Sequence, residues 1–486
     1  MGLFKNLFKQ TAIYGLATVL PRMFSFLLVP LYTSLLPKEE YGQITVIFSY
    51  MIFFNVILAY GMETSFFRFY SKEDNKNTVV ETSTVSIFWT TVLFLALALV
   101  FKGHLAEWSG IGAQYVTYAI WILALDAFVI IPFSKLRAQG KPGKYAIIKI
   151  LNVVIMLAFN VFFLTVLPEI FEHNPTSFLG SIYFEDFQIG YIFVSNIIAS
   201  LFTFVVLSDN YFRIKWHFNF NLWKKMMRYG WPILFAGIAF AINEHIDKIL
   251  LEYLLPPNTA TAQVGIYGAI YKLGVFMVLF RTAYTLGIEP FFFSYAHNEN
   301  APQTYAMITK YFVIFGAFIQ LGVVVFADIL KVIMIQDSSY WEAMKVLPLI
   351  ILANFFLGIY TNLSVWYKLI DKTYIGAIIS IIGAAVTIAL NFLLIPSIGY
   401  FGSAIATLAA YSTMMLISYS WGNKYYPIPY DMKKIVAYLA ISIIFSVGSF
   451  YYFRENYYIG TSLLLLFAYY KKKNEKDVIF KVLKVK

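Results

Sequence analysis

Residues 82–101 read TSTVSIFWTTVLFLALALVF, a stretch without a single charged side chain. A helix needs roughly 20 predominantly apolar residues to cross the hydrocarbon core of a bilayer. Stretches of this kind recur along the whole chain, in which apolar residues form 60% and charged residues 13% of 486. A soluble domain carries about 25% charged residues, and the mean hydropathy here is +0.70. The sequence therefore predicts an all-α membrane protein.

The chain has room for about fourteen spanning helices at this length per span. They are expected near 11–36, 41–61, 82–101, 114–134, 145–167, 188–207, 229–253, 264–290, 305–327, 344–366, 373–396, 400–421, 433–452 and 456–470.

The loops between these spans carry charge unevenly. If the N-terminus lies inside, most of the loop Lys and Arg residues lie inside too, whereas the longest outside loop, near 168–187, has four acidic residues and no Lys or Arg. Positively charged loops are retained in the cytoplasm. We therefore expect a cytoplasmic (inner) membrane protein with both termini in the cytoplasm. The net charge of +11 has the same explanation and does not indicate nucleic-acid binding.

Residues 211–228 alternate basic side chains with aromatic ones. This pattern favours an interfacial helix that lies on anionic lipid. The alternative is an ordinary basic loop with aromatic anchors.

Two distant parts of the chain share the pattern G-x-E-x-x-F-F. It reads GMETSFF over 61–67 and GIEPFFF over 287–293, and in both places a Leu-Leu-Pro element and a Tyr and Gly pair precede it. The two similar stretches begin with spans one and seven, which both start inside, so they predict parallel repeats related by an axis along the membrane normal. Transporters built in this way bind substrate between the halves near the midplane. The expected order is a six-helix lobe over 1–210, a basic amphipathic linker over 211–228, a second six-helix lobe over 229–424, an additional helix pair over 425–470 and a basic cytoplasmic tail over 471–486.

Charged side chains inside the predicted spans are the strongest functional signal. A charge at mid-bilayer costs roughly 2.5–3.5 kcal/mol on insertion scales, so it persists mainly beside an internal cavity or a partner. Arg22, Asp126 and Arg281 lie deepest. Two alternatives stay open: Arg22 and Asp126 form a structural ion pair, and Arg281 reaches back to the cytoplasmic interface.

Two further groups of charges lie nearer the ends of spans. Glu244, Asp247 and Lys248 fall on one helix face, where they either pair with one another or take part in ion coupling. Glu63 and Glu289 stand at the cytoplasmic ends of spans two and eight. They are candidates for an inner gate, with Arg68 or neighbouring helix ends as partners, or they are simply solvated end charges.

Enzymatic signatures are missing from the sequence. It has no cysteine, no phosphate-binding loop, no dinucleotide fingerprint and no metal-ligand spacing. We therefore expect no catalytic residues, no metal site and no ATP hydrolysis within this chain.

Taken together, these motifs resemble the bacterial polysaccharide flippases of the multidrug/oligosaccharidyl-lipid/polysaccharide exporter superfamily. The resemblance covers spans one to twelve, with a further helix pair as in the fourteen-helix members. Its carriers are Pro21-Arg22 with Val29-Pro30-Leu31-Tyr32 and Tyr41-Gly42, then the stretch Gly61 to Phe69, Asp247-Lys248 before Leu254-Leu255-Pro256, Val264-Gly265-Ile266-Tyr267, Val346-Leu347-Pro348, and Lys368 to Thr373.

The resemblance implies a function and a site. It implies that the chain moves an undecaprenyl-pyrophosphate-linked oligosaccharide between leaflets, through a cationic cavity between two lobes. Arg22, Lys248 and Arg281 would then engage the pyrophosphate or acidic sugars. Na⁺ or H⁺ coupling at Asp126 or Glu244 is compatible with this function, and polysaccharide-assembly proteins would join membrane lipids as partners.

Three other functions remain in view. A cation-coupled multidrug exporter of the same fold would favour carboxylates over cations in its cavity. A membrane polysaccharide polymerase would resemble enzymes with a large periplasmic loop, and the longest outside loop here is short. A membrane scaffold would leave the mid-bilayer charges unexplained.

Overall fold

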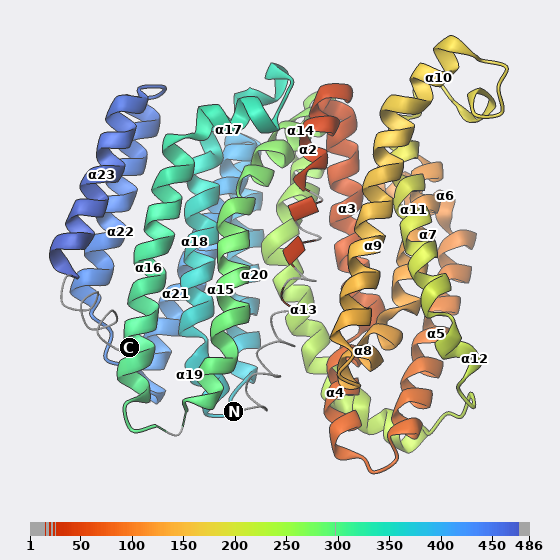
Figure 1. Cartoon of the computed structure of the whole chain (residues 1–486), viewed down its shortest axis with the longest axis horizontal. Helices are drawn as coiled ribbons and strands as arrows, with labels where there is room; N and C mark the ends of the chain where they lie inside the picture. The colour runs from red at the N-terminus through yellow and green to blue at the C-terminus, as the bar shows by residue number, and fades with distance from the viewer. Residues whose placement is uncertain (1–14, 16–18, 21–22, 25, 297, 476–486) are drawn as a thin grey trace. The chain divides into compact units, whose positions relative to one another are not determined.

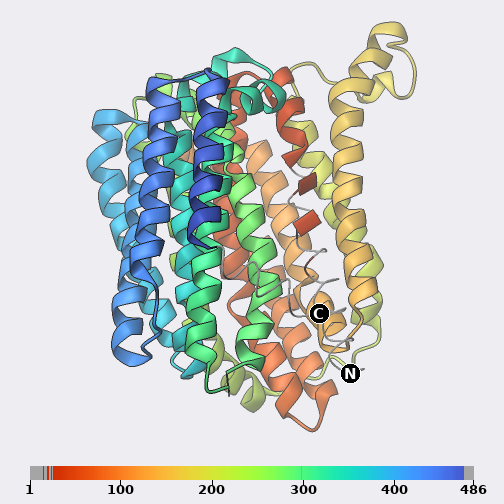
Figure 2. The ribbon, with the colours of Figure 1, turned by 60° about the vertical axis from the view of Figure 1, so that its left-hand side comes forward.

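The computed structural model describes residues 15, 19–20, 23–24, 26–296 and 298–475. This part of the chain is built from helices and contains no strand, which confirms the all-α prediction. It forms two compact units, Met1–Gly268 and Ala269–Lys486. In each unit the long helices run side by side (Figures 1 and 2).

Ten helical stretches in the described residues are long and apolar enough to cross a membrane, and an eleventh arises if Pro257–Leu273 and Val275–Glu289 are one bent span. The chain is therefore a multi-pass membrane protein, as predicted. The first expected span, 11–36, lies largely outside the described residues. Two other expected spans coincide with Phe220–Leu254 and Tyr457–Asn474, which are helical but less apolar. The count of fourteen stays a prediction.

The first unit contains most of the helices of the N-terminal half. They are α2 (Leu28–Leu35), α3 (Lys38–Ala59), α4 (Met62–Lys72), α5 (Lys76–Val100), α6 (Lys102–Ser109), α7 (Ala113–Phe128), α8 (Ile130–Ala138), α9 (Pro142–Val161), a π-helical turn (Phe162–Val166), α10 (Leu167–His173), a short 3₁₀ turn (Gly180–Ile182), α11 (Gln188–Leu207), α12 (Asp209–Phe212), α13 (Phe220–Leu254) and most of α14 (Pro257–Leu273).

Local sequence explains where several of these helices begin and end. Asn75 and Asn219 cap α5 and α13, because their side-chain oxygens accept hydrogen bonds from the backbone N–H groups three residues later. Tyr60 and Gly61 separate α3 from α4 with positive φ values of 30° and 71°. Glycine adopts this left-handed conformation at little cost.

The predicted linker over 211–228 is only partly helical. Residues 215–219 have no regular structure, and 220–228 form the beginning of the long helix α13. The first unit extends to Gly268 because α13 and the first part of α14 pack on α3. The interfacial position of 211–228 and the lobe ranges stay predictions.

Glycines allow α3 to approach α13 and α14 closely at both of its ends. A Cβ atom on Gly42 would collide with the backbone carbonyl oxygen of Thr261, and one on Gly265 would collide with that of Lys38. On α3 the Lys38 carbonyl lies one helical turn before Gly42, and on α14 the Thr261 carbonyl lies one turn before Gly265. The crossing of α3 and α14 is therefore nearly symmetric. At the other end of α3, a Cβ on Gly61 would collide with the carbonyl of Gly230 on α13. Gly42 and Gly265, which lie in the Tyr and Gly elements of the sequence repeat, therefore bring the backbones of α3 and α14 into contact.

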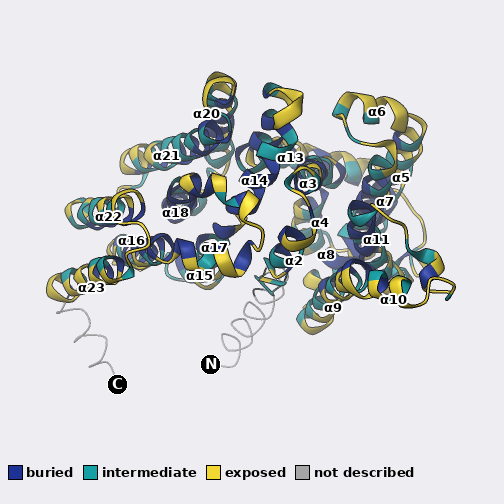
Figure 3. Ribbon diagram, turned by 90° about the horizontal axis from the view of Figure 1, so that it is seen from above, coloured by how far each residue is buried: buried dark blue, intermediate teal, exposed yellow. Residues whose placement is uncertain are grey.

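The second unit is arranged around α18, which Figure 3 shows largely buried, with α15, α16 and α21 packed on it. Trp366 and Tyr411 are among its largest fully buried side chains. Its elements are α15 (Val275–Ser294), α16 (Ala301–Val325), α17 (Ala327–Met334), a 3₁₀ segment (Ser338–Val346), α18 (Leu347–Leu363), α19 (Val365–Leu369), α20 (Tyr374–Ile398), α21 (Tyr400–Tyr425), α22 (Met432–Val447), a π-helical turn (Gly448–Tyr452) and α23 (Tyr457–Asn474).

The additional helix pair, α22 and α23, packs beside α16 (Figures 1 and 2), and ion pairs fasten it at both ends. After α23, the Glu475 carboxylate lies 2.7 Å from Lys310 Nζ of α16 and 3.1 Å from Lys434 Nζ of α22. Before α23, Arg454 Nη2 lies 2.9 Å from Asp328 Oδ1 of α17. The pair is therefore tied to the core of the second unit by charge as well as by apolar packing.

We expect Glu475→Gln to destabilise the protein by about 2 kcal/mol at pH 7, the usual contribution of hydrogen bonds to a charged group. Burial raises the pKa of Glu475, but hydrogen bonds from Lys310 and Lys434 outweigh burial and lower the pKa overall. The stabilisation is therefore complete above the unfolded-state pKa of about 4.3 and is lost as the pH falls through the lower folded-state pKa. Thermal unfolding between pH 7 and pH 3 measures it.

The matched control is Glu299→Gln, which removes an exposed loop carboxylate. It should leave the unfolding temperature unchanged. Equal unfolding temperatures for wild type and Glu475→Gln at pH 7 would show that the helix pair does not depend on this ion pair.

Candidate functional site

Asp126 lies within α7 and is held by a neighbouring helix. Its Oδ1 atom accepts a 2.8 Å hydrogen bond from Ser200 Oγ of α11. The residue is only partly buried. A charged group inside a membrane span persists mainly beside a polar cavity or a partner. The proposed structural partner, Arg22, lies outside the described residues.

Lys149 of α9 is a second intramembrane charge, and sequence reasoning missed it. Its Nζ atom lies 4.3 Å from the centre of the Phe133 ring, and it interacts electrostatically with Asp126. The expected span began at Tyr145, which placed Lys149 close to the end of the span, where charged side chains are common. The Pro at position 142 was the available signal, because proline favours the first helical turn and α9 indeed begins there.

The same region of α9 carries further polar side chains. Asn152 Nδ2 donates to the carbonyl oxygen of Ala199 and to Thr203 Oγ1 of α11, both at 2.9 Å. Asn160 Oδ1 accepts a 2.7 Å hydrogen bond from Tyr32 OH of α2. With Lys149, these asparagines give α9 a polar side inside the first unit. We call Asp126, Lys149, Asn152 and Ser200 the first-unit polar cluster.

Each unit has an ion pair at the glutamate of its G-x-E-x-x-F-F motif. Glu63 Oε1 lies 2.8 Å from Arg137 Nη1 in the first unit, and Glu289 Oε1 lies 2.6 Å from Lys368 Nζ in the second. Arg137 and Lys368 both follow the fourth span of their repeat half, so the repeat extends to the partners. Glu63 thus pairs with a neighbouring helix end, whereas Arg68 stacks on the Tyr229 ring at 4.1 Å.

We expect the Glu63–Arg137 pair to contribute no more than about 1 kcal/mol, because both side chains are more than 40% exposed. Glu63→Arg should lower the unfolding temperature through like-charge repulsion. The double variant Glu63→Arg/Arg137→Glu should restore it, whereas Glu63→Arg/Lys368→Glu should not. A double-mutant cycle on the purified protein measures the coupling, and a coupling energy of zero for Glu63 and Arg137 would contradict the pairing.

The charges of span seven form a local cluster on α13. Lys248 Nζ lies 2.7 Å from Asp247 Oδ1, and Tyr267 OH donates to Asp247 Oδ2 at 2.7 Å. The predicted local pairing is therefore present for Asp247 and Lys248. The Glu244 carboxylate lies 3.8 Å from His245 Nε2. Roles of Lys248 in substrate binding and of Glu244 and Asp247 in ion coupling stay predictions.

Arg281 lies on α15, which is separated from α14 by a break in the helix at Gly274. The axes of α14 and α15 are bent by 46° at this break. One turn beyond Arg281, Tyr284 OH donates a 2.8 Å hydrogen bond to Asn362 Oδ1 of α18. Tyr284 and Asn362 line a small pocket together with the Glu289–Lys368 ion pair.

Metal binding finds no support in the described part of the chain. No group of three or more His, Asp and Glu side chains within residues 26–296 and 298–475 is placed to hold a metal ion.

Comparisons with known proteins agree with this architecture. A family model described as "Polysaccharide biosynthesis protein" matches residues 7–284, while no curated protein matches the chain. The solved structure "Lipid II flippase MurJ, inward closed conformation" is similar with a TM-score of 0.72 and 15% identity, over 96% of this chain and 100% of that one. An inward-facing multidrug resistance MATE family transporter of the MOP superfamily is similar with a TM-score of 0.63 and 12% identity, over 86% and 96%. At these identities the likeness concerns the fold.

Proposed function

Because the chain belongs to the polysaccharide biosynthesis protein family, we propose that it is a flippase for an undecaprenyl-pyrophosphate-linked oligosaccharide. It would move this lipid across the bacterial cytoplasmic membrane by alternating access, with both of its own termini in the cytoplasm. The MurJ-like and MATE-like fold supports a transporter. The observation that carries the proposal is the set of cationic side chains within membrane helices, above all Lys149 and Arg281.

The chemistry of the cargo requires such cations. A sugar-pyrophosphate headgroup carries negative charge and many polar groups, so hydrocarbon excludes it. Buried positive charge offsets the desolvation of the pyrophosphate, while the polyprenyl tail stays in the membrane. Lysine acts as a compact point charge and arginine as a bidentate partner for phosphate oxygens. Arg22, Lys248 and Arg281 remain the proposed binding residues, and Lys149 joins them.

Ion coupling is proposed at Asp126. Its carboxylate has one side-chain hydrogen bond, from Ser200, and interacts with the positive charge of Lys149 without a direct ion pair between the two. Binding of H⁺ or Na⁺ there would change the net charge of the first-unit polar cluster. Asp247 is less suited, because it already accepts hydrogen bonds from Lys248 and Tyr267, while Glu244 remains a second proposed coupling site.

The close glycine contacts at the two ends of α3 could each act as a gate, one at either end of a transport path. Gly42 against α14 and Gly61 against α13 hold the helices in backbone contact, and separation of the helices at either end would open the path. The Glu63–Arg137 and Glu289–Lys368 pairs lie at the expected cytoplasmic end. We propose that they keep each half rigid there while the halves rock.

A multidrug exporter of the same fold is the second candidate, and the Asp126 carboxylate is the observation in its favour. A polymerase is not proposed, because the longest expected outside loop, near 168–187, is short. Membrane lipids and polysaccharide-assembly proteins are the expected partners of a flippase.

Binding to the purified protein discriminates the two candidates. We expect undecaprenyl pyrophosphate carrying a short oligosaccharide to bind, and Arg281→Ala and Lys149→Ala each to weaken binding at least about tenfold, a loss of 1.4 kcal/mol. Lys433→Ala, an exposed lysine at the start of α22, is the control. Tight binding of a cationic dye such as rhodamine 6G together with unchanged glycolipid binding by both variants would favour the drug exporter.

A further inference from the structure

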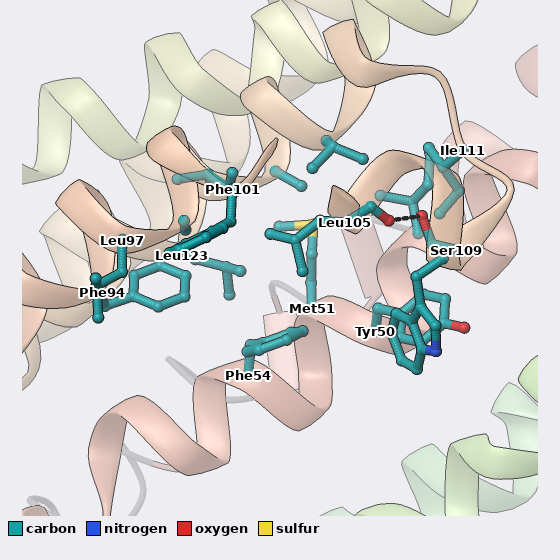
Figure 4. Close-up of a pocket in the computed structure, with 16 residues that line it drawn as sticks. Tyr50, Met51, Phe54, Phe94, Leu97, Phe101, Leu105, Ser109, Ile111 and Leu123 are labelled. Carbon is teal, nitrogen blue, oxygen red and sulfur yellow. Dashed lines mark hydrogen bonds between the residues drawn. The ribbon is translucent and has the colours of Figure 1, made fainter. Parts of the chain in front are cut away.

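A cavity of about 310 Å³ lies within the first unit, and no residue of the first-unit polar cluster lines it (Figure 4). Helices α3, α5, α6 and α7 enclose it. Its walls are aromatic and aliphatic side chains, including Met51, Phe54, Phe94, Leu97 and Leu123. This volume is at the lower end of the range of small-molecule sites, about 300–1,000 Å³.

The hydroxyl groups at the edge of the cavity already have hydrogen-bond partners. Tyr50 OH donates to Tyr253 OH at 3.0 Å, and Tyr253 OH donates to the carbonyl oxygen of Trp108 at 2.7 Å. Ser109 Oγ donates to the carbonyl oxygen of Leu105 at 2.6 Å, as Figure 4 shows. A buried water needs two to four polar partners. The lining therefore suits hydrocarbon rather than water.

The cavity is continuous with the lipid-facing surface of the protein. Leu97 and Phe101 line the cavity and are also 50% and 52% exposed. They lie at the end of α5, a membrane span whose neighbouring Leu93 and Val100 are exposed as well. Exposed apolar side chains on a membrane helix contact lipid tails, so a tail enters the cavity without crossing a polar layer.

A cationic and aromatic rim marks the end of the cavity at the water interface. The short helix α6 starts there, with Lys102 and His104 exposed beside Phe101. Trp108 lines the cavity and is 62% exposed. Tryptophan is enriched at membrane interfaces, and a lysine at this level attracts lipid phosphate.

We propose that this cavity binds one acyl chain of a membrane phospholipid whose phosphate lies at Lys102. An apolar chain matches the lining, and the charge of Lys102 matches the headgroup. The walls are apolar apart from Tyr50, Trp108 and Ser109 at the edge and carry no charge to select a rarer amphiphile, so the most abundant lipid of that leaflet fills the cavity by mass action. The site is independent of the proposed transport function.

Photolabelling tests the proposal. The full-length protein is placed in phosphatidylglycerol nanodiscs that contain a phosphatidylglycerol with a diazirine on one acyl chain, is irradiated, and is digested for mass spectrometry. We expect labels on the cavity side of α3, at Met51 and Phe54. Ala98→Phe places a ring inside the cavity and should reduce these labels at least fivefold.

Matched variants make the result decisive. Ala96→Phe adds the same ring to the same helix on its exposed face, and it should leave the labelling of α3 unchanged. Ala119→Phe fills the cavity from α7 and replaces Ala98→Phe if that variant does not fold. Lys102→Glu, a surface change, should reduce the labels at least twofold.

Two results would overturn the proposal. One is equal labelling of Met51 and Phe54 in wild type and in a folded Ala98→Phe or Ala119→Phe protein. The other is labelling of these residues by a diazirine polyprenyl phosphate in the same nanodiscs but not by the phospholipid, which would assign the cavity to the carrier lipid instead.

Discussion

Gly42→Ala is expected to abolish transport while the protein remains folded. The added Cβ atom would collide with the carbonyl oxygen of Thr261, and the two nearest atoms belong to the backbone of α14. Overpacking typically costs about 1–3 kcal/mol when side chains can adjust, and a backbone contact lies towards the upper limit. At 1.4 kcal/mol per factor of ten, the closed contact between α3 and α14 would become roughly a hundredfold less populated.

Gly322→Ala is the control for this substitution. Gly322 lies inside α16, and nothing lies within 4 Å of an added Cβ. Alanine in a helix interior is favoured over glycine by about 1 kcal/mol, so this variant should be at least as stable as the wild type and equally active. Gly265→Ala should repeat the effect of Gly42→Ala, and the double variant should add little, because both remove the same crossing. If the Gly42→Ala protein transports at the wild-type rate, the contact between α3 and α14 does not have to close during transport.

Asp126→Asn is expected to reduce transport at least about a hundredfold, or 2.8 kcal/mol, with the fold preserved. The asparagine oxygen still accepts the hydrogen bond from Ser200, so the contact between α7 and α11 remains. The negative charge that faces Lys149 is lost, and with it the group proposed to bind H⁺ or Na⁺. Wild-type transport should respond to a proton or sodium gradient, whereas the variant should not.

The partner lysine separates a role in coupling from a role in stability. Removing one charge leaves the other uncompensated, whereas removing both is often neutral for stability. Asp126→Asn/Lys149→Met should therefore unfold near the wild-type temperature and still not transport. Asp209→Asn, at an exposed ion pair with Arg213, is the surface control. Gradient-dependent transport by Asp126→Asn at the wild-type rate would exclude Asp126 from coupling.

Much of the architecture was predictable, because lipid imposes strict rules on sequence. Apolar stretches of about the bilayer thickness identified the multi-pass helical fold, and the G-x-E-x-x-F-F repeat identified the two equivalent glutamates. Lys272 and Arg281, nine residues apart, would point to opposite sides of a straight helix, so they could line one cavity only if the helix were bent between them, and it is bent at Gly274.

Tertiary partners were harder to predict than helices. Glu63 pairs with Arg137, which is distant in sequence, rather than with the nearby Arg68, and only the packing of α4 against α8 decides this. Lys149 was missed because the expected start of its span placed it too near an end. The apolar cavity arises from four helices whose apolar faces look alike in sequence. Arg22 lies outside the described residues, so its place in the site rests on sequence alone.

Flipping of a fluorescent undecaprenyl-pyrophosphate-linked oligosaccharide in proteoliposomes tests the proposed function most directly. The purified protein is reconstituted, and a membrane-impermeant quencher reports how much headgroup has moved between leaflets. We expect the wild type to move the glycolipid and Arg22→Ala, inserted at the same protein level, to move it no faster than protein-free liposomes. The account would be contradicted if the Arg22→Ala, Lys149→Ala and Arg281→Ala proteins all flipped the glycolipid at the wild-type rate. It would also be contradicted if the folded wild type did not flip the lipid-linked oligosaccharide under an ion gradient.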